Sequence, residues 1–443
     1  MTSSPCLIVV YDRGAATVGE IAAALPQLAS VVFVTREASE HTRPLLPLLQ
    51  DIGDVVTFRE SPAEAVGRLT SARPDGIVTY SESMLPVTAE LAAELGLPFH
   101  SRDTVRLLTD KYAQRRRLHA TGTDSVASRL ITSPEEWPGA LRAVGLPAIV
   151  KPVRGEGSRS TYRVDDSGGG FRLVSRLLAA EPGLVMEEFL QGRPCHPYGD
   201  YVSVESAVSK GAVSHLAVTG KFPLIPPFRE TGQFWPAPLP DEELRRVQDL
   251  TGEAIRALGI TTGITHTEIK LTNAGPRLIE VNGRLGGNIN DLSVRAVRRD
   301  LVELAGRLAL GEAVDAPPVT LNRVVFQYSN LAPSRPCRLD SLSGQRRLRN
   351  APGITGYRTW IRPGTPIDGG VSTHDLDLIR GEAADHAEMI ALLETALSHL
   401  TFGFTLPDGS MDFCTPALGT LHGKEAGRVS PTASPDPTRS TIR

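Results

Sequence analysis

The sequence predicts a chain of α/β and α+β class, and three observations support that prediction. Across about the first 100 residues, short apolar runs alternate with Ala-rich and Leu-rich amphipathic segments, which is typical of a doubly wound parallel sheet. The middle of the chain carries paired apolar runs joined by turn residues, which predicts antiparallel sheets. From 322 to about 402 the runs shorten and Pro-Gly turns appear, which predicts a small C-terminal α+β domain.

Composition excludes several classes of protein. The 443 residues are 41% hydrophobic, so the chain can bury large cores, and its length suggests two or three domains. A formal net charge of −3 argues against nucleic-acid binding, which needs a basic surface. No apolar run approaches the roughly 18 residues of a membrane span, and the N-terminus lacks a signal-peptide pattern. We therefore expect a cytoplasmic protein with no membrane partner, and four scattered cysteines fit a reducing compartment.

Lysine is scarce in this chain. Only six of the 47 basic residues are lysine, so arginine serves wherever a general surface cation suffices. A lysine is then a candidate for a position that needs a compact ammonium group, although the coding genome alone can produce the same bias. Four of the six lie in motifs, and these are Lys111, Lys151, Lys221 and Lys270.

Four apolar runs are the expected strands of the N-terminal sheet, at 7–11, 31–35, 55–58 and 76–80. No G-x-G-x-x-G follows the first of them, which removes the main support for a dinucleotide site. In such sheets ligands approach the carboxyl ends of the strands, so Ser81 and Glu82 could line a substrate pocket. Capping the next helix is the commoner role for residues at that position.

Two lysines follow the N-terminal sheet. A helix is expected over 103–119, with Asp103 as its N-cap and Lys111 within it. Read alone, Lys111 would be an ordinary solvated side chain. The next expected strand, 146–152, has Lys151 near its end.

A glycine-rich loop follows that strand over 154–161. Gly155 and Gly157 allow backbone N–H groups to approach an anion closely, and Ser158 adds a hydroxyl donor. The pattern indicates a flexible cover for phosphate groups. Taken singly, the spacing fits a simple hairpin turn at least as well.

The segment 184–192 reads as a strand that leaves a core and carries two adjacent acids. Its backbone near Leu190 could pair with the edge of a purine, and Glu187 or Glu188 could accept a hydrogen bond from the base or ribose. The alternative is an edge strand with acids that face solvent. The sequence does not decide which glutamate would contact a nucleotide.

A second pair of strands is expected over 198–208 and 214–232, and it ends in a Pro-rich loop. Lys221, Arg229 and Glu230 lie in or beside that loop, where binding residues commonly lie. Beyond it, helices are expected over 241–258, with Asp241 as N-cap, and over 291–310. One further helix is expected in the C-terminal domain, with Ile390, Leu393, Leu397 and Leu400 facing inward.

The segment 265–287 predicts a β-hairpin whose polar face carries a candidate metal site. With Asn273 and Gly275 in the turn and Ala274 at its centre, paired positions sum to 548. Glu268 then faces Glu280, and His266 faces Asn282. Alternation predicts one face with Ile269, Leu271, Ile279 and Val281, and the other with His266, Glu268, Lys270, Leu278, Glu280, Asn282 and Arg284.

Two facing carboxylates destabilise a sheet unless a cation lies between them. Carboxylate oxygens from Glu268 and Glu280 with an amide oxygen from Asn282, and no cysteine nearby, favour Mg²⁺ or Mn²⁺ over zinc. The alternative is a salt-bridged surface in which Lys270 and Arg284 neutralise the two glutamates.

Taken together and in order, these motifs resemble the ATP-grasp superfamily over roughly 103–311. Within it, the segments EEFLQG, YGDYVSVE, KFPLIPPFRETG and THTEIKL are similar to those of bacterial L-amino-acid ligases, which make dipeptides. The resemblance implies a two-lobed ATP-grasp core between the other two domains. With the N-terminal sheet, it gives a Rossmann-like domain over 1–102, a first lobe with the Gly-rich loop over 103–190 and a second lobe with the metal-binding hairpin over 191–318. The pattern that follows adds a cap domain over 319–415, and the Ser, Thr, Pro and Gly content of the end predicts a disordered tail over 416–443.

The resemblance also implies roles for single residues. ATP would lie between two sheets. Its phosphates would contact Lys111, Lys151 and the loop with Gly155, Gly157 and Ser158, and its adenosine would contact Glu187 or Glu188 and the backbone near Leu190. Glu268, Glu280 and Asn282 would hold Mg²⁺ or Mn²⁺. Arg284, Lys221 and Glu230 would act in catalysis, with Glu230 receiving a substrate ammonium.

The activity implied is ATP-dependent formation of an amide bond between amino acids, or between an amino acid and a peptide or amine, through an acyl phosphate. Alternatives are another ATP-grasp enzyme, such as a carboxylase or a nucleotide-biosynthesis ligase, and an ATP-binding regulator without turnover. The expected partners are small-molecule substrates, and a homodimer is an open alternative to a monomer.

Two positions depart from the family pattern. Thr219 stands where some amino-acid ligases have a histidine, and His266 could substitute for that imidazole or serve only the sheet. Arg193 replaces an acid that commonly follows the EEFLQG-type segment, which leaves ribose binding undecided.

Overall fold

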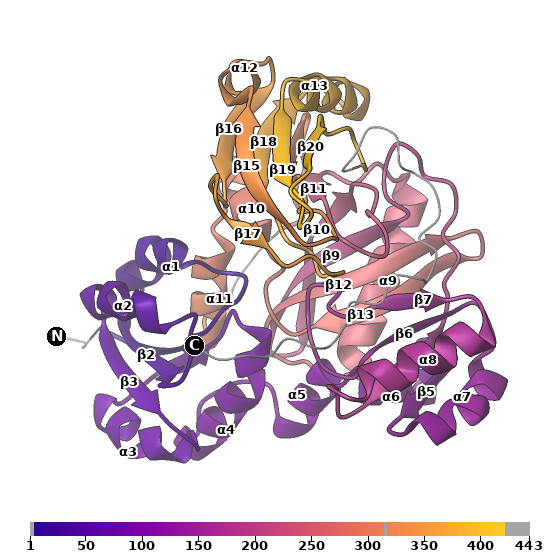
Figure 1. Ribbon diagram of the computed structural model, residues 1–443. Helices are drawn as coiled ribbons and strands as arrows, with labels where there is room; N and C mark the ends of the chain where they lie inside the picture. Colours follow the sequence, from indigo (N-terminus) through magenta and orange to yellow (C-terminus); the bar gives the residue numbers. More distant parts are fainter. Residues whose placement is uncertain (1–3, 314–316, 421–443) are drawn as a thin grey trace.

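The computed structural model describes residues 4–313 and 317–420. Its N-terminal part is a parallel sheet in the order β3-β2-β1-β4, as the alternating pattern predicts (Figure 1). The strands are β1 (Cys6–Val10), β2 (Ser30–Arg36), β3 (Asp54–Phe58) and β4 (Gly76–Val78), and the main helices are α1 (Val18–Ala24), α2 (Leu46–Ile52), α3 (Ala63–Ala72) and α4 (Leu85–Leu95).

Each face of this sheet is buried against a different set of helices. In β1, Ile8 and Val10 pack in a core with side chains of α3 and α4, whereas Leu7 and Val9 face α1 and the later helix α11 (Leu301–Ala309). Burial on both faces explains why these strands are continuous apolar runs.

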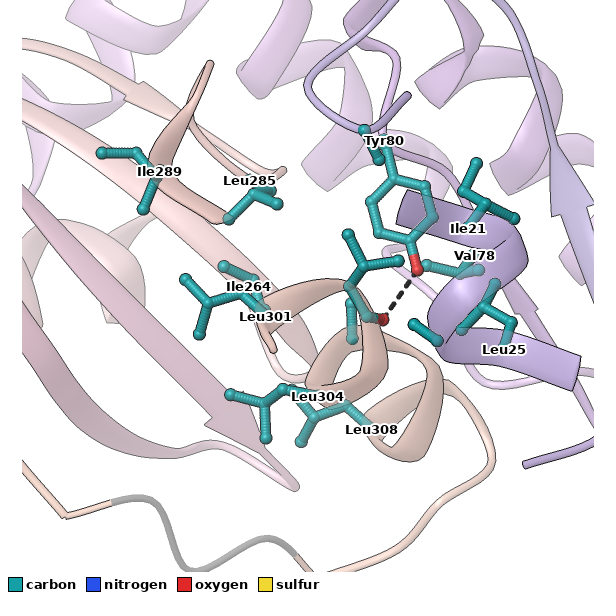
Figure 2. Packing of buried hydrophobic residues seen from close by; sticks show 14 of the residues in the cluster. Ile21, Leu25, Val78, Tyr80, Ile264, Leu285, Ile289, Leu301, Leu304 and Leu308 are labelled. Atoms are coloured by element: carbon teal, nitrogen blue, oxygen red, sulfur yellow. Dashed lines mark hydrogen bonds between the residues drawn. The ribbon is translucent and has the colours of Figure 1, made fainter. Parts of the chain in front are cut away.

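Helix α11 ties the N-terminal sheet to the rest of the molecule. Figure 2 shows Leu301, Leu304 and Leu308 packed in one cluster with Val78 and Tyr80 of the N-terminal part. The hydroxyl of Tyr80 donates to the carbonyl oxygen of Val302 at 2.9 Å. This contact fixes the carboxyl end of β4, and with it Ser81 and Glu82, against helix α11.

The expected helix over 103–119 is two helices. Asp110 is extended at φ −121° and ψ 102°, and it separates α5 (Arg102–Thr109) from α6 (Lys111–Ala120). Asp103 is not the N-cap. Ser101 caps α5 by accepting from the Thr104 N–H, and Asp110 caps α6 by accepting from the Ala113 N–H. Lys111 is therefore the first residue of a helix, not an interior one.

The first lobe is an antiparallel sheet in the order β5-β8-β6-β7. Strand β8 lies between two neighbours, so the alternative of an edge strand with solvent-facing acids at Glu187 and Glu188 is wrong. The elements of this lobe are β5 (Ser128–Ile131), α7 (Trp137–Val144), β6 (Ala148–Pro152), β7 (Tyr162–Val164), α8 (Ser167–Leu177) and β8 (Leu184–Glu188).

The second lobe is built on an eight-stranded sheet in the order β13-β12-β9-β10-β11-β14-β18-β16. Its strands are β9 (Tyr201–Ser209), β10 (Ala212–Lys221), β11 (Gly232–Trp235), β12 (Gly263–Thr272), β13 (Gly275–Asn282), β14 (Val324–Tyr328), β16 (Ile354–Thr359) and β18 (Asp377–Ala383). The last three come from the predicted cap. The predicted boundary between 318 and 319 therefore separates strands that share one sheet (Figure 1).

Two expected helices of this lobe differ in detail. Helix α9 (Asp241–Ala257) begins after Pro240, and Asp241 lies in its first turn without capping it. The helix expected over 291–310 is divided into α10 (Ile289–Val297) and α11, because Arg298 is left-handed at φ 55° and Asp300 starts a new helix as its N-cap.

The rest of the C-terminal part packs beside this sheet. A second sheet in the order β17-β15-β19-β20 contains β15 (Cys337–Ser343), β17 (Pro366–Ile367), β19 (Thr401–Thr405) and β20 (Met411–Cys414), with α12 (Gln345–Arg349) and α13 (His386–Ser398) as helices. At 416–420, where the tail was predicted to begin, the N–H of Gly419 donates to the hydroxyl of Tyr328. The remainder of the predicted disordered tail, 421–443, lies outside the described residues. In the described ranges, no helix is long and apolar enough to cross a bilayer.

Candidate functional site

A cleft of about 180 Å³ lies where the first lobe faces the hairpin of β12 and β13. It collects side chains that are far apart in sequence, from the end of β4, the start of α6, the strands β6 and β8, and the hairpin. Of the residues to which the resemblance gives a role, all except Lys221 line it: Lys111, Lys151, Gly155, Gly157, Ser158, Glu187, Glu188, Leu190, Glu230, Glu268, Glu280, Asn282 and Arg284. Of the two candidates after β4, Glu82 lines it and Ser81 does not.

The hairpin has the predicted pairing at its functional end. Glu268 pairs with Glu280 and His266 with Asn282. Towards the turn the register slips by one residue, because Ile269 pairs with Leu278 and leaves Ile279 as a β-bulge.

The bulge corrects the predicted faces. Leu278 is fully buried in the core, not on the polar face, whereas Ile279 lines the cleft, not the core. Paired positions therefore sum to 548 from Glu268–Glu280 to His266–Asn282, but not between the bulge and the turn.

The predicted alternative, in which Lys270 and Arg284 neutralise the two glutamates, is wrong, because each of these cations pairs with a different carboxylate. Lys270 Nζ lies 2.6 Å from Asp200 Oδ1, and Arg284 Nη2 lies 2.7 Å from Glu82 Oε2. Glu280 Oε1 instead accepts from Lys111 Nζ at 2.6 Å.

The donor set on the hairpin fits a hard divalent cation. Among the described residues, no hydrogen bond reaches Oε2 of Glu268, Oε2 of Glu280 or Oδ1 of Asn282, and all three side chains line the cleft. No group of three His, Cys, Asp or Glu side chains in the described ranges could hold a metal by itself. Two carboxylates and an amide suit Mg²⁺ or Mn²⁺, which take their remaining oxygens from water or substrate phosphates.

Lys111 connects the hairpin to the Gly-rich loop. Besides Glu280, its Nζ donates to the carbonyl oxygen of Gly155 at 2.7 Å. Burial by itself would lower the pKa of Lys111, but the carboxylates of Glu280 and Glu82 outweigh it and raise the pKa above its usual range. Lys111 is therefore a fixed positive charge in the wall of the cleft.

The Gly-rich loop lines the cleft in a conformation that needs glycine. Gly155 has φ 134° and Gly157 has φ 63°, and Ser158 follows in the left-handed region at φ 56°. Glu156 Oε2 lies 3.6 Å from Arg284 Nη2 on the opposite wall. The loop thus spans the cleft and touches both sides of it.

Glu187 and Glu188 have different surroundings. Glu187 is 4% exposed, and its carboxylate accepts from Arg115 Nε at 3.0 Å and lies 3.0 Å from Lys151 Nζ. Glu188 is partly exposed and lies 3.1 Å from Arg277 Nη2. Of the two, Glu188 is the one with room to meet a ligand.

Arg115 is a site residue that the sequence did not reveal, because it stands in a run of three arginines that reads as surface charge. Its guanidinium is buried between the lobes, where it binds Glu187 and Asp124 and donates to the carbonyl oxygens of Leu278 and Ile279. The bulge at Ile279 presents one of these carbonyls. Arg115 thereby fixes β8 relative to the hairpin.

We predict that Glu187 makes stability depend on acid pH. Burial would raise its pKa, but Arg115 and Lys151 outweigh that effect and lower the pKa to about 2. Because the folded-state pKa lies below the unfolded value, the stabilisation is present above about pH 4.5 and is lost towards pH 2, up to about 3 kcal/mol. Urea unfolding midpoints of wild type and Glu187→Gln should differ at pH 7 and converge as the pH falls. A difference that does not change with pH would contradict this assignment.

Lys221 does not line the cleft in the described part of the chain. It is 2% exposed at the end of β10, and its Nζ donates to Gln233 Oε1 at 2.9 Å. Glu230 does line the cleft, and its Oε2 lies 3.7 Å from Lys221 Nζ. The structure therefore brings Glu230 to the site and leaves Lys221 in the wall behind it.

The C-terminal part contacts both the Gly-rich loop and the Pro-rich loop with Glu230. Thr373 Oγ1 accepts from the Glu230 N–H at 3.2 Å, and the Thr373 N–H donates to the carbonyl oxygen of Gly157 at 3.5 Å. The buried Arg229 donates to the carbonyl oxygen of Ala332 at 2.7 Å. These contacts place the predicted cap beside the cleft.

A buried polar group behind the hairpin was also missed from sequence. Glu205 on β9 is fully buried, pairs directly with His266 across the sheet and accepts from its Nδ1 at 2.9 Å. His266 Nε2 lies 3.5 Å from Glu268 Oε1. The alternation of Ser203 and Glu205 with apolar residues in β9 was the available signal.

These buried groups are charged. Burial would lower the pKa of His266, but the charge and hydrogen bond of Glu205 raise it to about 9. Burial would raise the pKa of Glu268, but its contact with His266 keeps that pKa below its usual range. On the hairpin, Glu268 is therefore ionised at neutral pH.

Comparisons with known proteins agree with the geometry. A model of the ATP-grasp domain matches residues 110–288. An uncharacterised protein of Sinorhizobium fredii is 30% identical over 66% of this chain and 60% of its own length. Alanine–anticapsin ligase of Bacillus subtilis is 29% identical over 58% of each chain. The chain thus spans about three fifths of these two relatives.

Among solved structures, an L-amino acid ligase from Bacillus licheniformis superposes with a TM-score of 0.73 at 20% identity. The match covers 90% of this chain and 98% of that one. The fold of this chain is accordingly the ATP-grasp fold with a preceding α/β domain, as the sequence predicts.

Proposed function

We propose, from the match of residues 110–288 to the model of the ATP-grasp domain, that the protein is an ATP-dependent carboxylate–amine ligase. It would join an amino acid to a second amino acid, a peptide or another amine. The observation that carries the proposal is the convergence, in one cleft, of two lysines, a Gly-rich loop, two facing glutamates with Asn282, and Arg284. Relatives that are ligases by name support it.

The nucleotide would occupy the space between β6, β8 and the hairpin. Lys111 and Lys151 would neutralise its phosphates beneath the Gly-rich loop, and Glu188 with the backbone near Leu190 would meet the adenosine. ATP supplies the γ-phosphoryl group that turns a substrate carboxylate into an acyl phosphate, from which an amine displaces phosphate. A cation held by Glu268, Glu280 and Asn282 would offset the negative charge of the phosphates.

Glu82 and Arg284 together suit an amino acid as the activated substrate. They present opposite charges 2.7 Å apart in the same cleft, one from each side of the domain junction. A zwitterion could place its ammonium at Glu82 and its carboxylate at Arg284, whose fixed charge also suits the oxyanion of amide formation. Glu230, at the C-terminal end of the cleft, would receive the second ammonium.

The contacts around Thr373 support the exclusion of water. An acyl phosphate hydrolyses if water reaches it, so the Gly-rich loop must remain closed while the amine enters. Thr373 bonds both to that loop and to the segment with Glu230. The C-terminal part would therefore close the site around both substrates.

We predict that purified protein with ATP and Mg²⁺ releases phosphate only when a suitable acid and a suitable amine are both present. A panel of amino-acid pairs, with phosphate release measured and condensed products identified by mass spectrometry, tests this. Omitting either substrate is the control. Phosphate release that needs bicarbonate or a nucleotide precursor in place of an amino acid would indicate a carboxylase or nucleotide-biosynthesis ligase instead. ATP binding without turnover of any pair would indicate a regulator.

A further inference from the structure

The carboxylate of Glu205 is enclosed by hydrogen-bond donors. It is fully buried on β9 and accepts from Ser203 Oγ at 2.8 Å, from Thr219 Oγ1 at 3.1 Å and from His266 Nδ1 at 2.9 Å. A buried carboxylate is tolerated only when its oxygens are satisfied in this way. Glu205 therefore has one defined orientation.

Thr219 contributes to that orientation through the direction of its proton. Trp235 Nε1 donates to Thr219 Oγ1 at 2.7 Å, so the hydroxyl proton is left to point at Glu205. The position where some amino-acid ligases have a histidine is thus used here to hold a carboxylate.

His266 is clamped on both sides. Its ring is 5% exposed, Glu205 holds Nδ1, and the backbone of Gly286 lies so close that a Cβ there would be 2.4 Å from Nδ1. The other ring nitrogen, Nε2, lies 3.5 Å from Glu268 Oε1. A line of contacts thus runs from the core of the sheet to a carboxylate in the cleft.

We propose that Glu205 and His266 are positioning residues that hold Glu268 so that its second oxygen faces the cleft and can bind a divalent cation. This inference rests on the proposed function, because it assumes a metal-dependent nucleotide site. The need is physical. Glu268 directly faces Glu280 across the hairpin, and like charges at that separation repel. Lys111 holds Glu280, and His266 provides the corresponding hold on Glu268.

Two substitutions of His266 separate its two contacts. The amide nitrogen of asparagine takes the place of Nδ1, so His266→Asn keeps the bond to Glu205 and loses Glu268. The amide nitrogen of glutamine takes the place of Nε2, so His266→Gln keeps Glu268 and loses Glu205. His215→Asn is the matched control, because His215 bonds Ser206 on the same sheet and does not line the cleft in the described residues.

The readouts are Mn²⁺ binding in the presence of ADP, followed by the paramagnetic resonance signal of free Mn²⁺, and the thermal unfolding midpoint. His266→Asn should bind Mn²⁺ about 10 to 100 times more weakly than wild type, with an unfolding midpoint close to that of wild type. It should also raise the KM for Mg²⁺ more than it lowers kcat at saturating Mg²⁺. His266→Gln should lower the midpoint, because it loses Glu205, and should weaken Mn²⁺ binding less than His266→Asn does, because it keeps the contact with Glu268. His215→Asn should bind Mn²⁺ as wild type does.

Unchanged Mn²⁺ affinity in His266→Asn would overturn the inference. If that variant does not fold, Glu205→Gln decides, since its amide no longer offers two acceptors to the ring. Weaker Mn²⁺ binding then supports the inference, and wild-type binding overturns it. Failure of the proposed function has a different signature, namely wild-type protein that neither binds Mn²⁺ with ADP nor condenses any substrate pair.

Discussion

Glu280→Gln is expected to lower kcat/KM for ATP-dependent condensation at least about 1,000-fold, because it removes one of two facing carboxylates on the hairpin. It also removes the partner of Lys111, whose Nζ lies 2.6 Å from Glu280 Oε1. The substitution keeps the size of the side chain, so the loss reflects charge and not packing. Glu280→Ala should abolish phosphate release. Coupled measurement of phosphate release with saturating acid and amine gives the result.

The matched control is Glu312→Gln, which removes a carboxylate that pairs with Arg307 on the surface, away from the cleft. We expect it to change the rate by less than about twofold, as is usual for an exposed ion pair. If Glu280→Gln kept more than about a tenth of wild-type activity, the loss would be too small for a metal-binding carboxylate, and the metal assignment would be wrong.

Arg284→Ala is expected to suppress product formation about 100-fold or more while nucleotide binding remains largely intact. Arg284 lies beside Glu82 and Glu156. The two lysines assigned to the phosphates have other partners, Glu280 and Glu187. Its charge would be needed where a carboxylate becomes an acyl phosphate and then a tetrahedral oxyanion. Calorimetric titration with ADP and measurement of kcat/KM on the same preparation separate the two effects.

The substitution also leaves Glu82 buried without its partner, so stability must be followed in parallel. The double variant Glu82→Gln/Arg284→Ala removes both charges and serves as the control for that effect. If it regains a wild-type unfolding midpoint without regaining activity, the lost activity comes from the charges of the Glu82–Arg284 pair and not from lost stability. Loss of ADP binding equal to the loss of activity would contradict the assigned role.

In the hairpin of β12 and β13, the sequence predicted the strand pairing but not the bulge. Alternating polarity and turn residues were enough to predict that Glu268 pairs with Glu280 and His266 with Asn282, and both pairs are present. Counting residues from the turn could not reveal the bulge at Ile279, because one extra residue in a strand leaves the local composition unchanged. It reversed the predicted faces of Leu278 and Ile279.

The two helix breaks have a local cause that the hydrophobic pattern conceals. The apolar spacing continues through Asp110 and through Arg298, so each pair of helices reads as one. A capping aspartate follows or coincides with each break, at Asp110 and at Asp300. The first break matters for function, since it places Lys111 at the start of a helix beside the Gly-rich loop.

The partners of the charged groups depend on contacts between distant segments. Lysine scarcity and the glycine loop pointed to Lys111, Lys151, Gly155, Gly157 and Ser158, which all line the cleft. The pairs Arg115–Glu187, Glu82–Arg284 and Glu205–His266 join residues 61 to 202 positions apart, and periodicity carries no information over that distance. The sharing of one sheet between the second lobe and the C-terminal part was hidden for the same reason.

The most direct test is a crystal structure with ADP and Mn²⁺, in which anomalous scattering locates the metal. We expect a Mn²⁺ peak in contact with carboxylate oxygens of Glu268 and Glu280, between the hairpin and a nucleotide whose phosphates reach Lys111 and Lys151. A nucleotide bound there with its metal away from both glutamates, or bound elsewhere on the molecule, would contradict this expectation.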